Sequence, residues 1–119
     1  MSKSGSAKHG LKPNYKLWFE SDGEYIFGPG ACDILTAVLE EGTLTKGAEK
    51  IGMSYRYAWG VIRKIEHKLG TPLIETFKGG KTGGGGATVT EQGLKFIKAY
   101  SELRRAIEDV LKKRGSLSL

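Results

Sequence analysis

The chain has 119 residues, 39% of them apolar, and a formal net charge of +6 at pH 7. This length suits one compact domain and is short for two of ordinary size. A single cysteine, Cys32, excludes an intramolecular disulfide and a cysteine-based zinc finger, and the basic charge favours a polyanionic partner. No run approaches the roughly 20 apolar residues of a membrane span, so we expect a soluble protein that remains in the cell.

Residues 1–13 combine glycine, serine and lysine with almost nothing to bury, which predicts a flexible basic tail or an arm that lies along phosphates. Residues 115–119 are expected to form a second tail, so the compact domain should span residues 14–114. It begins with two aromatic segments, 15–19 and 24–28, around an Asp-Gly pair. That pair is a strong turn signal between strands, and the pattern predicts an N-terminal β-hairpin.

Two helices are predicted after the hairpin. Pro29 and apolar residues at helical spacing predict the first over residues 29–41, and Gly42 should end it. Thr43 or Thr45 can cap the second helix. The inner face of this second helix is expected to hold Leu44, Ala48 and Ile51.

A third helix is predicted after a turn at Gly52, with Ser54 as its cap. Its buried stripe should hold Ala58, Ile62, Ile65 and Leu69. Since a helix turns by about 100° per residue, another set shares the opposite, basic side: Arg56, Gly60, Arg63, Lys64 and His67, with Tyr57 beside them. Two short helices joined by a tight turn, the second with a basic outer face, are typical of a DNA-reading helix-turn-helix. The alternative is an ordinary solvated face of an amphipathic helix.

The residues of this basic side are expected to have different roles. Arg56 and Tyr57 lie in the first turn, where a recognition helix usually reaches base edges. Arg63 and Lys64 lie deeper in the helix and should meet phosphates. Gly60 has no side chain, so the backbone there could approach the floor of a groove closely.

Residues 73–77 and 87–90 predict two strands joined by the glycine-rich run KGGKTGGGG, an arrangement typical of a wing. The glycines permit close backbone approach, and Lys78 and Lys81 can meet phosphates or a minor groove. A loop without function is the alternative. The letters GKT match the end of a phosphate-binding P-loop, but Glu75 stands where that motif needs glycine, and a strand follows instead of a helix.

The last predicted helix spans residues 91–113 and can be capped by Thr90. Its apolar residues recur at steps of 4, 3, 4 and 3: Phe96, Tyr100, Leu103, Ile107 and Val110. Such a regular apolar stripe on a long helix is typical of a helix that packs against a partner helix. We therefore expect these residues to form a dimer interface.

Candidates for catalysis or metal binding are few. Cys32 lies in the apolar register of the first helix, and His9 and His67 have no metal-ligand spacing to other candidates. Adjacent carboxylates such as Glu40 and Glu41 more often make ion pairs on a helix surface than acid–base dyads. We therefore expect neither an enzyme nor a cofactor or metal site.

Two segments, GTLTKGAEKIGMSYRYAW and FKGGKTGGGGATVTEQG, resemble the N-terminal DNA-binding domain of ModE, the molybdate-responsive transcriptional regulator of bacteria and archaea, and more distantly LysR-type winged helices. The resemblance covers about residues 14–112. It implies a mainly α fold with small β elements, a winged helix-turn-helix that dimerises through its terminal helices and binds a near-palindromic operator. By position, residues 54–57 begin the family's recognition helix and residues 78–86 form its wing, whereas Gly60 stands where the family often has an acid. Full ModE proteins continue into molybdate-binding domains, but this chain ends at Leu119, so we do not expect molybdate binding from this chain.

These patterns and the resemblance together predict a sequence-specific transcriptional regulator, cytoplasmic and associated with the nucleoid, that binds double-stranded DNA as a homodimer. The expected DNA-binding residues are Thr45, Ser54, Tyr55, Arg56, Tyr57, Gly60, Arg63, Lys64, Lys78 and Lys81. Two alternatives remain open. The chain could be a sequence-tolerant architectural DNA-binding protein, or an interaction module that pairs through its long helix with another regulator.

Overall fold

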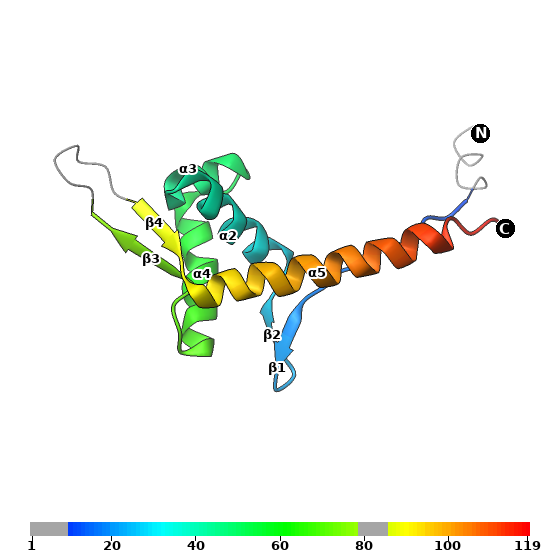
Figure 1. Cartoon of the computed structure of the whole chain (residues 1–119), viewed down its shortest axis with the longest axis horizontal. Helices are drawn as coiled ribbons and strands as arrows, with labels where there is room; N and C mark the ends of the chain where they lie inside the picture. The colour runs from blue at the N-terminus through cyan, green and yellow to red at the C-terminus, as the bar shows by residue number, and fades with distance from the viewer. Residues whose placement is uncertain (1–9, 79–85) are drawn as a thin grey trace.

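The structure is a computed structural model that describes residues 10–78 and 86–119. Its elements are β1 (Phe19–Ser21), β2 (Glu24–Phe27), α2 (Pro29–Glu41), α3 (Leu44–Lys50), α4 (Tyr55–Leu69), β3 (Ile74–Phe77), β4 (Gly86–Val89) and α5 (Glu91–Arg114). The helices α2, α3 and α4 form a compact body, the β3-β4 hairpin projects from one end of it, and α5 extends beyond the other end (Figure 1). This mainly α architecture with two small antiparallel hairpins is the predicted winged helix-turn-helix. Residues 1–9 of the expected basic tail and Lys81 of the expected wing lie outside the described ranges.

The N-terminal hairpin forms at the predicted turn but has a shorter first strand. Asp22 and Gly23 have φ values of 51° and 77°, the left-handed conformations that a two-residue turn of this type requires. The first strand begins only at Phe19, and the residues before it contact both Tyr25 of β2, through Trp18, and α5. There the Tyr100 hydroxyl donates a hydrogen bond to the carbonyl oxygen of Leu17 over 3.0 Å.

Caps and glycine turns set the bounds of the helices, as predicted. α2 ends at Gly42, whose φ of 81° is left-handed. Thr43, and not Thr45, caps α3, since its hydroxyl oxygen accepts a hydrogen bond from the Lys46 N–H at 3.0 Å. Ser54 caps α4 in the same way. Because these signals are local, the sequence alone specifies where each helix begins and ends.

The helices α2 and α3 pack closely and are joined at their ends. A Cβ atom on Gly47 would lie 3.1 Å from the backbone nitrogen of Val38, so a larger residue there would push the helices apart. At the ends, the Lys50 ammonium lies 2.6 Å from Glu40 and 3.4 Å from Glu41, which confirms ion pairing of these acids. The hydrogen bond to Glu40 raises the pKa of Lys50. Since the groups are exposed, the pairs add little to stability.

In the described residues one hydrophobic core is built from the N-terminal hairpin, the four helices and the wing strands. The stripe of α4 is buried as predicted at Ala58, Ile62 and Ile65, whereas Leu69 at the end of the helix is half-buried. Cys32 is 1% exposed, and burial raises the pKa of its thiol. The thiol therefore stays protonated and acts as a small apolar core group.

An aromatic cluster attaches the first half of α5 to the N-terminal hairpin. The Phe96 ring stacks on Phe27 at a centroid distance of 4.6 Å. The Tyr100 ring lies edge-on to Phe19 and Phe27 at 6.3 and 5.9 Å. The sequence assigns Phe96 and Tyr100 to an intermolecular seam, whereas the structure places both in the chain's own core.

The difference arises because helical periodicity shows that a face is apolar, not which element covers it. Here the hairpin and the segment before it cover the side of α5 that carries the aromatic residues. The apolar residues of the second half of α5 that stay exposed are Leu103, Ala106 and Val110. They recur at steps of 3 and 4, and Ile107 beside them is half-buried. None of the described helices is both long and apolar enough to cross a membrane.

The two described ends of the chain lie beside each other at the far end of α5. Leu11 and Leu117 exchange two backbone hydrogen bonds of 2.8 and 2.9 Å. Nearer the body, the Tyr15 hydroxyl donates to the Glu108 carboxylate over 2.8 Å. The sequence predicts free tails here, but the parts that the structure describes are held against α5 and against each other, as Figure 1 shows.

Gly93 in the first turn of α5 tests how closely this helix packs against the base of the wing. A Cβ atom there would lie 2.6 Å from the Leu73 carbonyl oxygen and 2.6 Å from Val89 Cγ1. We expect Gly93→Ala to lower the free energy of unfolding by about 1–3 kcal/mol, because α5 must move away from the wing strands. Urea denaturation followed by circular dichroism measures the change.

The matched control is Gly60→Ala, because nothing lies within 4 Å of a Cβ atom placed on Gly60 in α4. That substitution should stabilise the fold by about 0.5–1 kcal/mol through helix propensity alone. Equal stability of the two variants would contradict the close packing at Gly93.

Candidate nucleic-acid interface

The outer face of α4 brings the predicted contact residues together on one exposed surface. Packing of the opposite stripe into the core fixes the orientation of the helix, so the outer face must point to solvent. Tyr55 and Tyr57 in the first turn are 50% and 61% exposed. The other exposed residues of this face, all predicted as DNA contacts, are Ser54, Arg56, Gly60, Arg63 and Lys64. Basic side chains, aromatic rings and a stretch of helix backbone without side chains thus share one surface.

Arg63 is held in place without being buried. Its guanidinium carbon lies 5.1 Å from the centre of the Trp59 ring, and its Nη1 lies 3.9 Å from the Glu66 carboxylate. Its side chain remains 65% exposed. Trp59 itself is half-buried and packs against the core. The cation–π contact limits the conformations of Arg63 and leaves its donors free for an anion.

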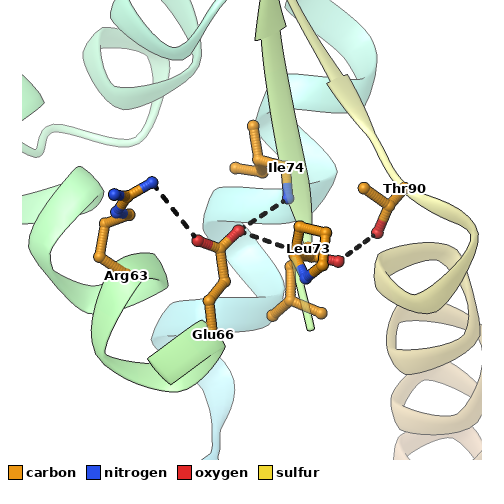
Figure 2. Close-up of polar contacts among 6 residues, drawn as sticks. Arg63, Glu66, Leu73, Ile74 and Thr90 are labelled. Atoms are coloured by element: carbon orange, nitrogen blue, oxygen red, sulfur yellow. Dashed lines mark hydrogen bonds and ion pairs between the residues drawn. The ribbon is translucent and has the colours of Figure 1, made fainter. Parts of the chain in front are cut away.

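Glu66 connects α4 to the base of the wing. Figure 2 shows its carboxylate reaching from α4 to the backbone at the start of β3. One oxygen accepts hydrogen bonds from the N–H groups of Leu73, at 2.8 Å, and Ile74, at 3.1 Å. Charge-assisted bonds of this kind are stronger than neutral ones, so the wing strand is fixed to the helix beside it.

Thr90 fixes the other strand of the wing to α5. Its hydroxyl donates to the Pro72 carbonyl oxygen at 2.7 Å (Figure 2) and accepts from the Gly93 N–H at 3.1 Å. Its backbone N–H donates to the Leu73 carbonyl oxygen at 2.9 Å. The Thr90 side chain is thus both the predicted cap of α5 and part of the wing base. The described part of the wing is therefore attached to both α4 and α5.

A hollow between α3 and the outer halves of the wing strands adds residues that the sequence reasoning missed. It is lined by the start of α3, the start of α4 and both wing strands, including the predicted residues Thr45 and Tyr55. Lys46, Thr76 and Phe77 also line it and are exposed, but the sequence pattern did not single them out. Lys46 could have been found, since it follows Thr45 in the first turn of the helix. Thr76 and Phe77 could not, because only the fold brings β3 to α3.

Two predicted residues remain. Lys78 is exposed and directly follows β3, whereas Lys81 lies beyond the part of the wing that the structure describes. Across the described ranges 10–78 and 86–119, no group of His, Cys, Asp and Glu side chains could hold a metal ion.

The family of the chain follows from comparison with known proteins. A family model described as "Bacterial regulatory helix-turn-helix protein, lysR family" matches residues 31–94. The chain belongs to this LysR family. The matched range contains α3, α4 and the wing, which are the elements that build the surface described above. Since this is a family of regulators, the expectation of a non-enzyme is confirmed.

Curated relatives of this LysR-family chain confirm the resemblance to ModE. The DNA-binding transcriptional dual regulator ModE of Escherichia coli (strain K12) is 32% identical over 94 residues, which are 76% of this chain and 36% of that protein. The molybdenum-pterin-binding protein MopA of Rhodobacter capsulatus is 35% identical over 78 residues, which are 66% of this chain and 29% of MopA. The chain spans about a third of the length of these relatives.

Solved structures share the fold. One is the DNA-binding domain of BenM in complex with benA site 1 DNA. The match has a TM-score of 0.53 at 23% identity and covers 71% of this chain and 91% of the BenM chain. The DNA-binding domain of CbnR, also in a DNA complex, has a TM-score of 0.52 at 22% identity with the same coverage. At this level of identity the likeness confirms the winged helix-turn-helix fold.

Removal of the Glu66 carboxylate tests the connection between α4 and the wing. In Glu66→Ala the N–H groups of Leu73 and Ile74 lose their acceptor, and we expect a loss of about 1–3 kcal/mol in stability. Amide hydrogen exchange at these two residues should accelerate as well. Glu75→Ala is the control, since Glu75 is exposed on β3 and its loss should change stability by less than about 0.5 kcal/mol. Similar exchange rates in the two variants would argue against the connection.

Proposed function

We propose that the chain is a sequence-specific transcriptional regulator that binds double-stranded DNA as a homodimer, with α4 in the major groove and the wing on the flanking backbone. The observation that carries the proposal is the exposed face of α4, where arginine, lysine and tyrosine side chains surround Gly60 on a helix anchored by its opposite side. A major groove admits one α-helix, and its base edges distinguish all four base pairs. The relatives support this role, because ModE is named a DNA-binding transcriptional regulator and the BenM and CbnR domains were solved with DNA.

The positions of the residues along α4 favour base contacts for some of them and phosphate contacts for others. Arg56 and Tyr57, in the first exposed turn, are the candidates for base contacts. Arg63 and Lys64, two turns later, are the candidates for phosphate contacts, together with Lys46 in α3 and Lys78 directly after β3. Each phosphate neutralised by a lysine or arginine makes affinity more dependent on salt.

Gly60 supports close approach of DNA to the middle of α4. A glycine inside a helix costs about 1 kcal/mol relative to alanine. Nothing in the fold requires it, because a Cβ atom there would meet no atom within 4 Å. A helix that must lie close to the floor of a groove gives such a glycine a use that protein packing does not.

The exposed stripe on α5 supports the homodimer. The residues Leu103, Ala106 and Val110 form a line on a helix that extends beyond the body, with no described part of the chain covering it. Packing of two such stripes would bury them and place two α4 helices on one face of DNA. A two-fold dimer of this kind would read half-sites about 34 Å apart, which predicts a near-palindromic operator.

Selection of bound genomic fragments by the purified protein tests the main proposal. We expect a recurrent near-palindromic sequence to be enriched. Binding of all fragments without enrichment would instead favour an architectural DNA-binding protein. A lack of DNA affinity even at low salt would favour an interaction module.

Arg56→Ala tests the assignment of base contacts. One good bidentate contact is worth about 1–3 kcal/mol, so affinity for the selected operator should fall roughly 5- to 150-fold while affinity for random DNA changes little. Fluorescence anisotropy with both DNAs at fixed salt measures the ratio. Arg105→Ala removes the same charge from the exposed surface of α5 and serves as the control. Equal losses for both DNAs would make Arg56 a phosphate ligand.

Leu103→Gln combined with Val110→Gln tests the dimer. Loss of two apolar side chains from an interface should raise the dimer dissociation constant by roughly tenfold or more. Sedimentation equilibrium measures it. Leu94→Gln is a matched control, because Leu94 lies on the opposite side of α5 and has the same 43% exposure as Leu103. A monomeric wild-type chain, or equal weakening by the control, would overturn the homodimer.

A further inference from the structure

A groove of about 440 Å³ lies beside α4, on the side that faces the N-terminal hairpin. Its walls come from β2, from the first turn of α2 and from the flank of α4. These three elements are separate in sequence and meet only in the fold. In Figure 1 the hairpin and the C-terminal end of α4 lie on the same side of α5. The volume falls in the range of about 300–1,000 Å³ that is usual for small-molecule sites.

The groove has an apolar floor. The apolar side chains that line it are Ile26, Pro29, Ala31, Met53, Val61 and Ile65. Two aromatic side chains form its walls, Tyr25 from the hairpin and Tyr57 from α4. The Tyr25 ring is held against Trp18 at a centroid distance of 5.9 Å, so this wall is supported from behind.

The rim of the groove is positively charged. Three lysines line it, Lys16, Lys64 and Lys68, and none of the described lining residues is acidic. Lys68 is partly compensated by Glu24, whose carboxylate lies 3.6 Å away. Lys16 and Lys64 form no ion pair within residues 10–78 and 86–119. An occupant would therefore meet apolar surface below and at least two uncompensated ammonium groups above.

We propose that this groove binds a small amphipathic anion, with an aromatic or other apolar body on the floor and a carboxylate or phosphate group at the lysines. The apolar floor favours this occupant over DNA, whose sugar-phosphate backbone is polar along its whole length. The lysines favour it over a neutral apolar molecule. Tyrosine walls suit a flat ring, which can pack on their faces.

Occupancy of the groove would act on DNA binding, a step that rests on the proposed function. Tyr57 and Lys64 line the groove and also belong to the outer face of α4. An anion that binds Lys64 uses a cation otherwise available to phosphate, and its negative charge lies beside the DNA. By linkage, DNA must then weaken the ligand by the same factor as the ligand weakens DNA.

Titration of the whole chain with 1-naphthoate, followed by amide NMR shifts, tests the site without DNA. We expect saturable shifts at Ala31, Val61 and Ile65, with a dissociation constant of about 1 mM or lower for a ligand of this size. Two probes separate the contributions. 1-Naphthalenemethanol has the same rings without the charge, inorganic phosphate has the charge without the rings, and each should bind at least about threefold more weakly.

Substitutions test whether 1-naphthoate binds in this groove and whether the groove is distinct from the DNA surface. Lys16→Gln, which lies outside the proposed DNA contacts, should weaken 1-naphthoate about threefold, whereas Lys98→Gln on the exposed surface of α5 should not. Val61→Trp should fill the groove and abolish the shifts while the rest of the spectrum keeps the folded pattern. Absence of saturable shifts, shifts located elsewhere, or equal affinity in Lys16→Gln and the wild type would overturn the proposal.

A separate experiment measures the effect of 1-naphthoate on DNA binding. Saturating 1-naphthoate should lower operator affinity of the wild type and have no such effect on Val61→Trp. If 1-naphthoate binds as expected but the chain has no DNA affinity, the groove stands and the proposed function fails. If 1-naphthoate does not bind and Lys16→Gln weakens DNA as much as Lys64→Gln does, the groove belongs to the DNA surface and the ligand site is wrong.

Discussion

The hydrogen bonds from the N–H groups of Leu73 and Ile74 to the Glu66 carboxylate determine how the two halves of the proposed interface lie relative to each other. α4 and the wing are separated by a turn, and both contribute apolar residues to the core, Ile62 from α4 and Ile74 and Val89 from the wing. A partly buried carboxylate with two backbone donors supplies a directional constraint that hydrophobic packing lacks. On the second strand, the Thr90 hydroxyl makes a similar hydrogen bond to the backbone at Pro72. Hydrogen bonds therefore orient the wing from both strands.

The aromatic cluster plays the corresponding part for α5. The cluster packs Phe96 and Tyr100 against the N-terminal hairpin, whereas Leu103 and Val110 further along the helix stay exposed. The fold and the proposed assembly thus use adjacent stretches of one helix. This arrangement makes the direction of α5 a property of the single chain, before any partner binds.

Sequence reasoning succeeded where the determining interactions are local. The caps at Thr43 and Ser54, and the glycine after α2, lie within a few residues of the atoms they satisfy, so helix bounds could be predicted closely. The outer face of α4 followed from helical periodicity for the same reason. Contacts between distant residues could not be predicted, such as the bond from Tyr100 to Leu17, the hollow between α3 and the wing strands, and the lysine-rimmed groove. Periodicity identified the apolar face of α5 but could not show that its first half is covered by the chain itself.

The bridge between Leu11 and Leu117 brings both described ends of the chain together at the far end of α5. The 14 residues of α5 that follow Tyr100, at 1.5 Å each, form a lever about 21 Å long beyond the aromatic core. Force or torque applied at its outer end would reach α4 through that core and through the base of the wing. Any element fused there would therefore communicate with the helix-turn-helix by tilting α5, and its own surface would stay clear of α4.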